Sequence, residues 1–318
     1  MSENLLRVGP RHFRAHGLGN DYLVFEAVPA PGVPVSAASS LMADAWPLSP
    51  GAVKLVCDRW KGVGSDGIVL LLDRRPDEGE PFPLRMFNPD GSEFERSGNG
   101  LRILAAFLAR EGLVQEGSSF TVRSGGSLIP MEVHGVDSFG TYDVSVEMGQ
   151  ATLGAAGVAL SADATAIGTH RFRLNRPDGS EVSFVPVSVG NPHAVVFSAD
   201  LSDEALVRVG PFLSSHDAFA RGTNVQLAHA LGPDVLEIRI WERGVGRTAA
   251  SGTSSCAAAV AGVALGALEP GPIEVRMPGG RLRVEVSASL DVVLRGPVGH
   301  VGDGVLSEGF LRVLGAQD

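Results

Sequence analysis

Cysteine is scarce in this sequence, and its scarcity excludes two kinds of site. Only Cys57 and Cys256 occur among 318 residues, both beside apolar neighbours. Two such cysteines make neither a disulfide framework nor the closely spaced ligand set of a zinc site. We therefore expect two structural thiols and no metal site.

Long hydrophobic runs and clustered positive charge are also missing. No stretch of ~20 uninterrupted apolar residues occurs, and residues 1–17 hold no apolar run suited to a signal peptide. The net charge is −10, without a stripe of Lys and Arg of the kind that binds nucleic acid. We expect a soluble, cytoplasmic protein whose partner is a small molecule, not nucleic acid or a membrane.

The composition is that of a folded, loop-rich protein. Hydrophobic residues make up 44% of the chain, which also contains 41 Gly and 20 Pro. At 318 residues the chain exceeds the size at which one hydrophobic core usually stops growing, so two domains are predicted. Residues 27–52 and 73–83, broken by proline and rich in small or charged residues, are predicted to be surface connections.

Strands dominate the predicted secondary structure. Alternating or β-branched runs predict strands at Tyr22–Phe25, Gly67–Leu72, Tyr142–Met148, Val182–Val189, Ala194–Phe197, Val235–Trp241, Ile273–Met277 and Leu282–Val286. Two segments of small and apolar residues, Gly100–Arg110 and Ser254–Leu268, predict helices, and each begins just after a Ser-Gly pair.

The two helices belong to an internal repeat. The run from Gly19 to Phe25 resembles the run from Gly190 to Phe197, each a Gly-Asn turn that leads into an apolar strand. Arg85 precedes Ser97 by the same number of residues as Arg239 precedes Ser251. Agreement in motif, order and spacing indicates a duplicated unit.

The predicted fold class is α+β, with two pseudo-symmetric halves. Each half is a curved mixed or antiparallel, barrel-like sheet wrapped around a central helix. We place one half at residues 1–127 with a C-terminal strand at 303–318, and the other at residues 128–302. The two helix N-termini are then able to face each other across a cleft.

The helix starts suit an anionic ligand. A helix N-terminus presents unpaired N–H groups and the positive end of the helix dipole, so it can hold a carboxylate without a lysine. The candidate residues are Ser97, Gly98 and Asn99 at one start and Ser251, Gly252 and Thr253 at the other. Alternatively, each serine is only an N-cap that accepts a backbone hydrogen bond.

Six blocks of sequence resemble the motifs of the diaminopimelate epimerase family, in the family's order. They are HGLGNDY at 16–22, GVGSDG at 62–67, RMFNPDGSEFERSGNG at 85–100, VGNPHAVV at 189–196, TNVQ at 223–226 and ERGVGRTAASGTSSCAAA at 242–259. The resemblance covers nearly the whole chain. It implies that family's fold and a role in lysine and peptidoglycan precursor biosynthesis, the epimerisation of LL- to meso-diaminopimelate.

The resemblance implies a reaction with no pyridoxal phosphate, no metal and no other cofactor. One thiolate removes the α-proton and a thiol on the opposite face returns one, so the stereocentre inverts. The family's two cysteines stand where this sequence has Ser97 and Ser251. A serine hydroxyl ionises far above neutral pH and needs an adjacent base.

The residues that the resemblance places near the serines are His193, Asp90 and Glu242. His193 is either such a base or a polar side chain satisfied within a turn. Cys256 cannot replace the missing thiol, because five residues along a helix turn it about 140° away from Ser251 and into the core.

Substrate recognition is preserved better than the acid and base. The resemblance assigns substrate contacts to Asn20, Asn88, Asn191, Asn224, Glu242 and Arg243. Asparagine amides donate and accept, Arg243 can hold a distal carboxylate through two hydrogen bonds, and Glu242 can pair with an ammonium. Asn20, Asn88 and Asn191 can alternatively be turn formers, since each stands beside Gly or Pro.

Three functions remain open at this point. The first is an epimerase of diaminopimelate, with a homodimer as the family's expected assembly. The second is a racemase, isomerase or eliminase that acts on another small amino acid. The third is a protein that binds an amino acid but has lost turnover, because serine replaces both cysteines.

Overall fold

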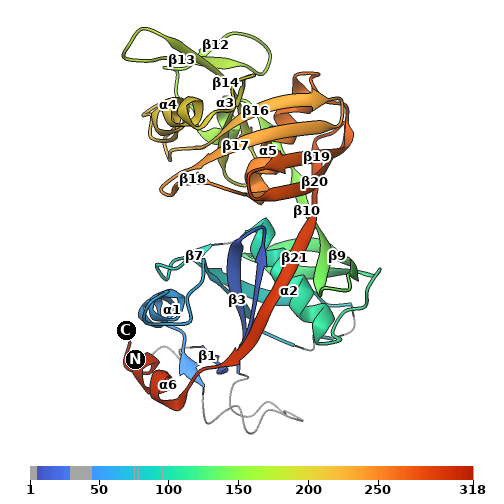
Figure 1. Ribbon diagram of the computed structural model, residues 1–318. Helices are drawn as coiled ribbons and strands as arrows, with labels where there is room; N and C mark the ends of the chain where they lie inside the picture. Colours follow the sequence, from blue (N-terminus) through green and yellow to red (C-terminus); the bar gives the residue numbers. More distant parts are fainter. Residues whose placement is uncertain (1–5, 29–44, 75, 78, 95, 318) are drawn as a thin grey trace. The chain divides into compact units, whose positions relative to one another are not determined.

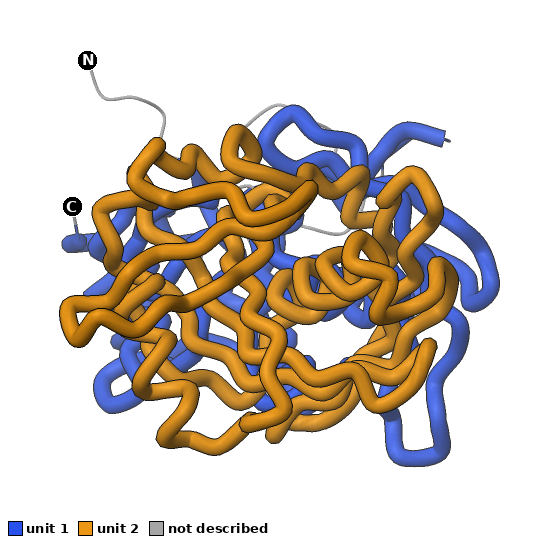
Figure 2. The backbone as a smooth tube through the Cα atoms, turned by 90° about the horizontal axis from the view of Figure 1, so that it is seen from above, with its two compact units in different colours: residues 1–146, 297–318 blue, residues 147–296 orange. Residues whose placement is uncertain are grey.

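The structure is a computed structural model that describes residues 6–28, 45–74, 76–77, 79–94 and 96–317 (Figure 1). The chain forms two compact units, coloured separately in Figure 2. Unit 1 consists of Met1–Val146 and Pro297–Asp318, and unit 2 of Glu147–Gly296. The first limit differs from the predicted 127/128, because the strand that begins at Ser127 pairs with the preceding strand inside unit 1. The second lies at 296/297, within the strand Asp291–Val305, where 302/303 was predicted.

Unit 1 is a strand barrel around a helix. Its strands pair in the order β9–β8–β6–β5–β3–β2–β21, and β21 pairs with β10 and β10 with β9, which closes the ring. The elements are β1 (Arg7–Val8), β2 (Arg11–Gly17), β3 (Asn20–Glu26), β4 (Trp46–Pro47), α1 (Pro50–Cys57), β5 (Ile68–Leu71), β6 (Phe82–Phe87), β7 (Glu93–Phe94), α2 (Gly98–Arg110), β8 (Ser119–Ser124), β9 (Ser127–Val136), β10 (Thr141–Gln150), β21 (Asp291–Val305) and α6 (Glu308–Leu314).

Unit 2 repeats this plan. Its strands pair in the order β11–β14–β15–β16–β17–β19–β20–β21. The elements are β11 (Thr152–Leu153), α3 (Ala155–Val158), β12 (Thr165–Ala166), β13 (Phe172–Asn175), β14 (Glu181–Ser188), β15 (Pro192–Phe197), α4 (Asp203–Ser214), β16 (Asn224–Gly232), β17 (Val235–Glu242), β18 (Gly246–Thr248), α5 (Gly252–Ala264), β19 (Gly271–Met277) and β20 (Gly280–Val286).

The strand pairing confirms the internal repeat. In unit 1 the parallel pairs are β3 with β5 and β6 with β8. In unit 2 they are β15 with β16 and β17 with β19, at the corresponding places. In each unit the helix lies between the two strands of the second parallel pair along the chain. Two similar α+β halves, each a curved sheet around a central helix, are therefore the architecture.

The central helices form the cores of the two barrels. Helix α2 packs against β2, β3, β5 and β9, and α5 packs against β14, β15, β16, β17, β19 and β20. Leu101, Leu104 and Leu108 of α2 are fully buried, which stabilises the fold by about 1.5–3 kcal/mol each. Helix α5 instead carries small residues, and at Gly262 an added Cβ would lie 2.4 Å from the Leu268 side chain.

The predicted strands and both predicted helices are present, with α2 and α5 each beginning two residues before the predicted start. The strands could be predicted because buried and partly exposed residues alternate along them. In β17, Leu236, Ile238 and Ile240 are buried while their neighbours are partly exposed. Among the described residues, no helix combines the length and apolar character that crossing a membrane requires.

In unit 1, one prediction is wrong and another is wrong in its last part. The predicted C-terminal strand at 303–318 ends at Val305, and α6 follows, because Ser307 caps it by accepting from the N–H of Phe310. The predicted surface connection at 27–52 ends in buried structure. Trp46 is 1% exposed and α1 begins at Pro50, although residues 29–44 lie outside the described part.

Candidate functional site

The start of α2 is a capped helix N-terminus. The Ser97 hydroxyl oxygen accepts a hydrogen bond from the backbone N–H of Gly100 at 3.1 Å. This is the capping role that was the alternative to a catalytic one, and it fixes the hydroxyl at the helix end. Gly98 and Gly100 are buried. The first turn of α2 therefore keeps free only those N–H groups that the serine does not use.

The start of α5 is built differently. Ser251 makes no side-chain cap hydrogen bond. Its carbonyl oxygen accepts from the Ser255 hydroxyl at 2.8 Å and from the Ser255 N–H at 3.1 Å. Gly252 and Thr253 are partly exposed, whereas Ser254 is fully buried. Of the two serines, Ser251 thus has the hydroxyl that is not committed to a helix cap.

Asn20 and Asn99 meet at the start of α2. The Asn99 side-chain nitrogen donates to the Asn20 carbonyl oxygen at 2.6 Å and to the Asn20 side-chain oxygen at 2.8 Å. Arg102, 1% exposed, donates to the Asn99 side-chain oxygen at 3.2 Å. Gly17 leaves room for this cluster, because a Cβ there would lie 1.8 Å from that oxygen. Two predicted site residues are therefore brought together.

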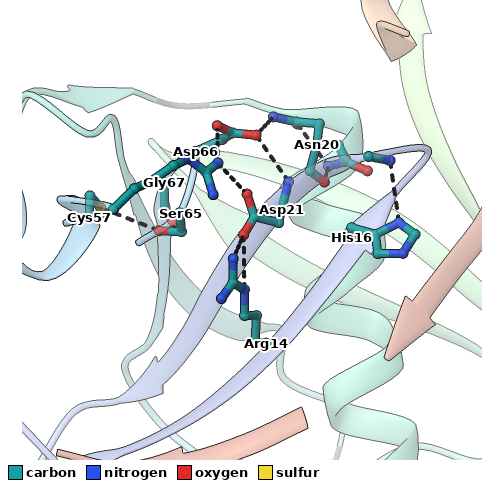
Figure 3. A network of polar contacts seen from close by, with 11 residues as sticks. Arg14, His16, Asn20, Asp21, Cys57, Ser65, Asp66 and Gly67 are labelled. Atoms are coloured by element: carbon teal, nitrogen blue, oxygen red, sulfur yellow. Dashed lines mark hydrogen bonds and ion pairs between the residues drawn. The ribbon is translucent and has the colours of Figure 1, made fainter. Parts of the chain in front are cut away.

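A charged network lies on the other side of Asn20 (Figure 3). The Asn20 side-chain nitrogen donates to Asp66 at 2.8 Å, and Arg59 bridges Asp66 and Asp21 with two contacts of 2.7 Å. Arg14 also pairs with Asp21 at 2.6 Å. Burial raises the pKa of Asp21, but the hydrogen bonds from Arg59 and Arg14 outweigh it and hold that pKa below its usual 3.8.

Asn88 and Asp90 belong to the turn between β6 and β7. The Asn88 side chain donates to the Ser92 hydroxyl at 2.9 Å, and that hydroxyl donates to Asp90 at 2.6 Å. Hydrogen bonds from Ser92 hold the pKa of Asp90 below its usual range. Both residues thus act here as turn formers, and a substrate role for Asn88 stays a prediction.

His193 is the centre of a buried polar chain in unit 2. Its Nε2 lies 2.8 Å from the Asn191 side-chain oxygen, and its Nδ1 lies 3.1 Å from the Gln226 side-chain nitrogen. Gln226 also donates to the Ser254 hydroxyl at 3.0 Å, which connects the chain to the first turn of α5. Burial lowers the pKa of His193 to about 3, so the ring is uncharged at neutral pH.

These contacts make His193 a satisfied buried side chain that orients Asn191. Both ring nitrogens have partners, and neither partner is Ser251. The contacts from Asn191 to Ser254 join amide, imidazole and hydroxyl groups. Amide, imidazole and hydroxyl groups can each donate or accept, so the direction of these hydrogen bonds can reverse as a whole.

Acid is expected to destabilise unit 2 through His193. The folded pKa is about 3 and the usual value is 6.5, so between them the unfolded chain binds a proton that the folded chain does not. Stability therefore rises with pH across this window and is lost as the pH falls below 6.5. A His193→Gln variant should lose less stability between about pH 7 and about pH 4.5, measured by hydrogen exchange in unit 2. Equal losses in both proteins would contradict this.

Asn224, Glu242 and Arg243 lie together at the end of β17. The Asn224 side-chain oxygen accepts from the Arg243 N–H at 3.0 Å, and its nitrogen donates to the Pro192 carbonyl at 3.3 Å. The Arg243 side chain donates to the Arg221 carbonyl and is exposed. Glu242, half-buried, is the last residue of β17. Asn224 thus links Arg243 to the turn that contains Asn191.

The two cysteines are structural, as the sequence predicts. Cys256 is fully buried on α5 and Cys57 is buried at the end of α1. Burial raises the pKa of Cys57 to about 11. At neutral pH such a thiol holds almost no thiolate, so it is a poor candidate for a proton-transfer group.

The sequence did not predict the residues that form hydrogen bonds with the predicted site residues. Asp66 and Gln226 stand inside motif blocks, as the fifth residue of GVGSDG and the last of TNVQ, but their partners are far along the chain. Arg102 had a usable signal, since it is a charge on the apolar side of GLRILAAFLAR, three residues after Asn99. A charge at that position needs buried oxygen partners.

Known proteins resemble this chain over most of its length. The sequence model of the family described as "Diaminopimelate epimerase" matches residues 13–154 and 185–301. The diaminopimelate epimerase of Desulforudis audaxviator is 38% identical, covering 92% of this chain and 97% of that protein. A protein named diaminopimelate epimerase 2 from a Nostoc species is 33% identical, with 93% and 95% covered.

Solved structures share the fold at lower sequence identity. A hydroxyproline epimerase from Agrobacterium vitis matches with a TM-score of 0.61 and 15% identity, covering 96% of this chain and 94% of that one. A phenazine biosynthesis protein from Bacillus anthracis matches with a TM-score of 0.59 and 16% identity, covering 96% and 100%. These likenesses agree with the predicted two-barrel fold.

Proposed function

The chain belongs to the diaminopimelate epimerase family, and we propose that it binds diaminopimelate and moves the α-proton without a cofactor. The observation that carries the proposal is that each unit puts an asparagine of a Gly-Asn turn in hydrogen-bond contact with the first turn of its central helix, directly or through two side chains. Helix N-termini of this kind suit a carboxylate.

The proposed roles follow the family's motif positions. Ser97 and Ser251 stand at the two proton-transfer positions, and the helix starts with Gly98, Asn99, Gly252 and Thr253 hold the α-carboxylate through backbone N–H groups. Asn20, Asn88, Asn191 and Asn224 orient the substrate, with His193 acting through Asn191. Arg243 would hold the distal carboxylate and Glu242 the ammonium.

A second candidate function is amino-acid binding with α-proton exchange too slow for metabolic use. One observation favours it: the Ser97 hydroxyl is committed to a helix cap, where it accepts from the Gly100 N–H. Without a base to accept its proton, a serine hydroxyl is a weak acid and a weaker base catalyst.

The first test is binding followed by exchange. Calorimetry of the natural protein with LL-diaminopimelate should show saturable binding, and proton NMR in D2O should show whether the α-proton signal is lost. Binding with exchange and appearance of the meso form supports the epimerase, and binding alone supports the second candidate. Absence of binding would contradict both and redirect the search to other small amino acids.

We also propose a cytoplasmic homodimer, as the family resemblance suggests. Light scattering of the purified protein across a range of concentrations would measure the mass, and a monomer at every concentration would reject the dimer.

A further inference from the structure

Asn20 is enclosed by partners whose hydrogen-bonding direction cannot change. We define the Asn20 relay as Arg102, Asn99, Asn20 and Asp66, in the order of their hydrogen bonds (Figure 3 shows its Asn20 and Asp66 end). An arginine only donates and an ionised carboxylate only accepts. The relay thus begins at an obligate donor and ends at an obligate acceptor.

These two ends dictate the orientation of both amides between them. Arg102 donates at 3.2 Å, so the atom of Asn99 that faces it is the oxygen. The Asn99 nitrogen then donates its two hydrogens to the carbonyl and side-chain oxygens of Asn20, at 2.6 and 2.8 Å. The Asn20 nitrogen in turn faces Asp66. If the Asn20 amide were reversed, its oxygen would face the Asp66 carboxylate and its nitrogen would face the Asn99 nitrogen.

Charged neighbours hold the acceptor end in place. One Asp66 carboxylate oxygen accepts a hydrogen bond from Arg59 at 2.7 Å. The other accepts from the Asp21 N–H at 3.1 Å and from the Asn20 side-chain nitrogen. Asp21, 6% exposed, is itself paired with Arg59 and Arg14. The carboxylate of Asp66 therefore cannot turn away from Asn20 without breaking contacts to a cation.

We propose that Asp66 and Asn99 are positioning residues that lock the Asn20 carboxamide in one orientation, so that Asn20 offers the substrate a hydrogen from its nitrogen. The ligand group that this arrangement favours is an oxygen acceptor, such as a carboxylate, over an ammonium. The corresponding contacts in unit 2, from Asn191 to Ser254, join amide, imidazole and hydroxyl groups, each of which can donate or accept. The two asparagines of the repeat thus differ in what they impose on a ligand.

Asp66→Asn tests the lock, because an amide can donate as well as accept. Asp303→Asn is the matched control, since it makes the same chemical change in an exposed ion pair with Arg110 in the same unit. The first readout needs no ligand: the side-chain amide signals of Asn20 and Asn99 in nitrogen-15 NMR, assigned by their absence from Asn20→Asp and Asn99→Asp variants. In the natural protein the hydrogens of Asn99 should be protected from exchange with D2O.

Asp66→Asn is expected to speed exchange of the Asn20 amide hydrogens by about tenfold or more, and Asp303→Asn to leave them unchanged. Gly17→Ala is the second variant: it pushes the Asn99 oxygen aside without altering any charge, and should release the same hydrogens. Asn20 hydrogens that exchange at the natural rate in folded Asp66→Asn or Gly17→Ala protein would overturn the proposal.

The ligand readout rests on the proposed function. In calorimetry, Asp66→Asn should weaken diaminopimelate binding by about tenfold, with Asp66→Glu recovering part of the loss because it restores an obligate acceptor. If neither the natural protein nor any variant binds diaminopimelate while the amide hydrogens respond as expected, the proposed function is wrong, but the fixed orientation of the Asn20 amide is supported. Unchanged affinity in an Asp66→Asn protein whose natural form binds would overturn the specificity that we assign to Asn20.

Discussion

Replacing Ser97 and Ser251 together by cysteine is expected to raise the rate of diaminopimelate epimerisation by about a hundredfold or more, the range that a well-matched acid–base group contributes. A thiol at a helix N-terminus ionises near neutral pH, because the helix dipole favours the thiolate. A serine at the same place has no such access to its anion. The hydroxyl of Ser97, moreover, already accepts from the Gly100 N–H.

The two single variants should differ from the double variant in kind. One cysteine supplies a base on one face only, so the α-proton should exchange with solvent while the product keeps its configuration. Inversion needs a competent donor on the opposite face as well. Proton NMR in D2O, combined with chiral analysis of the product, separates exchange from inversion.

Two other helix caps provide a matched control. Ser202 caps α4 by accepting from the Ala205 N–H at 3.2 Å, and Ser307 caps α6 at 3.3 Å. A Ser202→Cys/Ser307→Cys protein carries the same two substitutions at helix starts outside the predicted site, and should turn over at the natural rate. A natural protein that epimerises as fast as the Ser97→Cys/Ser251→Cys protein would contradict the expectation and show that the serines are activated.

Most of the fold could be predicted from local sequence patterns. The alternation in β17 and the Ser-Gly pairs before α2 and α5 report on single elements, whose periodicity is set by the neighbouring residues. Helix α1 was hidden because SPGAV looks like a loop by composition, although Ser49 accepts from the Ala52 N–H and Pro50 stands in the first turn, both ordinary helix-start signals.

Most of the candidate site depends on contacts between residues far apart in the sequence, and no local pattern predicts such contacts. Asn20 could be singled out as a turn residue, but its partners Asp66 and Asn99 lie 46 and 79 positions away. The burial of His193 depends on strands β14 and β16 on either side of β15. Its lowered pKa is therefore a property of the fold, and the sequence left the residue open between a base and a satisfied side chain.

The other large effect is expected from Asp21→Asn, which should lower the stability of unit 1 by about 2 kcal/mol. Asp21 is 6% exposed and takes hydrogen bonds from Arg59 at 2.7 Å and from Arg14 at 2.6 and 3.0 Å. The amide takes the carboxylate partner from Arg14 and leaves Arg59 with Asp66 as its remaining counter-charge. The arginines are 50% and 30% exposed, so they can partly turn to water, and the loss stays below that of a fully buried pair.

The pH dependence distinguishes lost charge from lost packing. The folded pKa of Asp21 is held below its usual 3.8, so its contribution is present above 3.8 and disappears as the pH falls through the folded value. The difference between Asp21→Asn and the natural protein should therefore be full at about pH 7 and shrink below 3.8. Hydrogen exchange followed by mass spectrometry measures it in peptides from β3 and α2, with peptides from unit 2 as the internal reference. A difference that persists undiminished in acid would mean that Asn disturbs packing, and that the two arginines do not depend on the charge of Asp21.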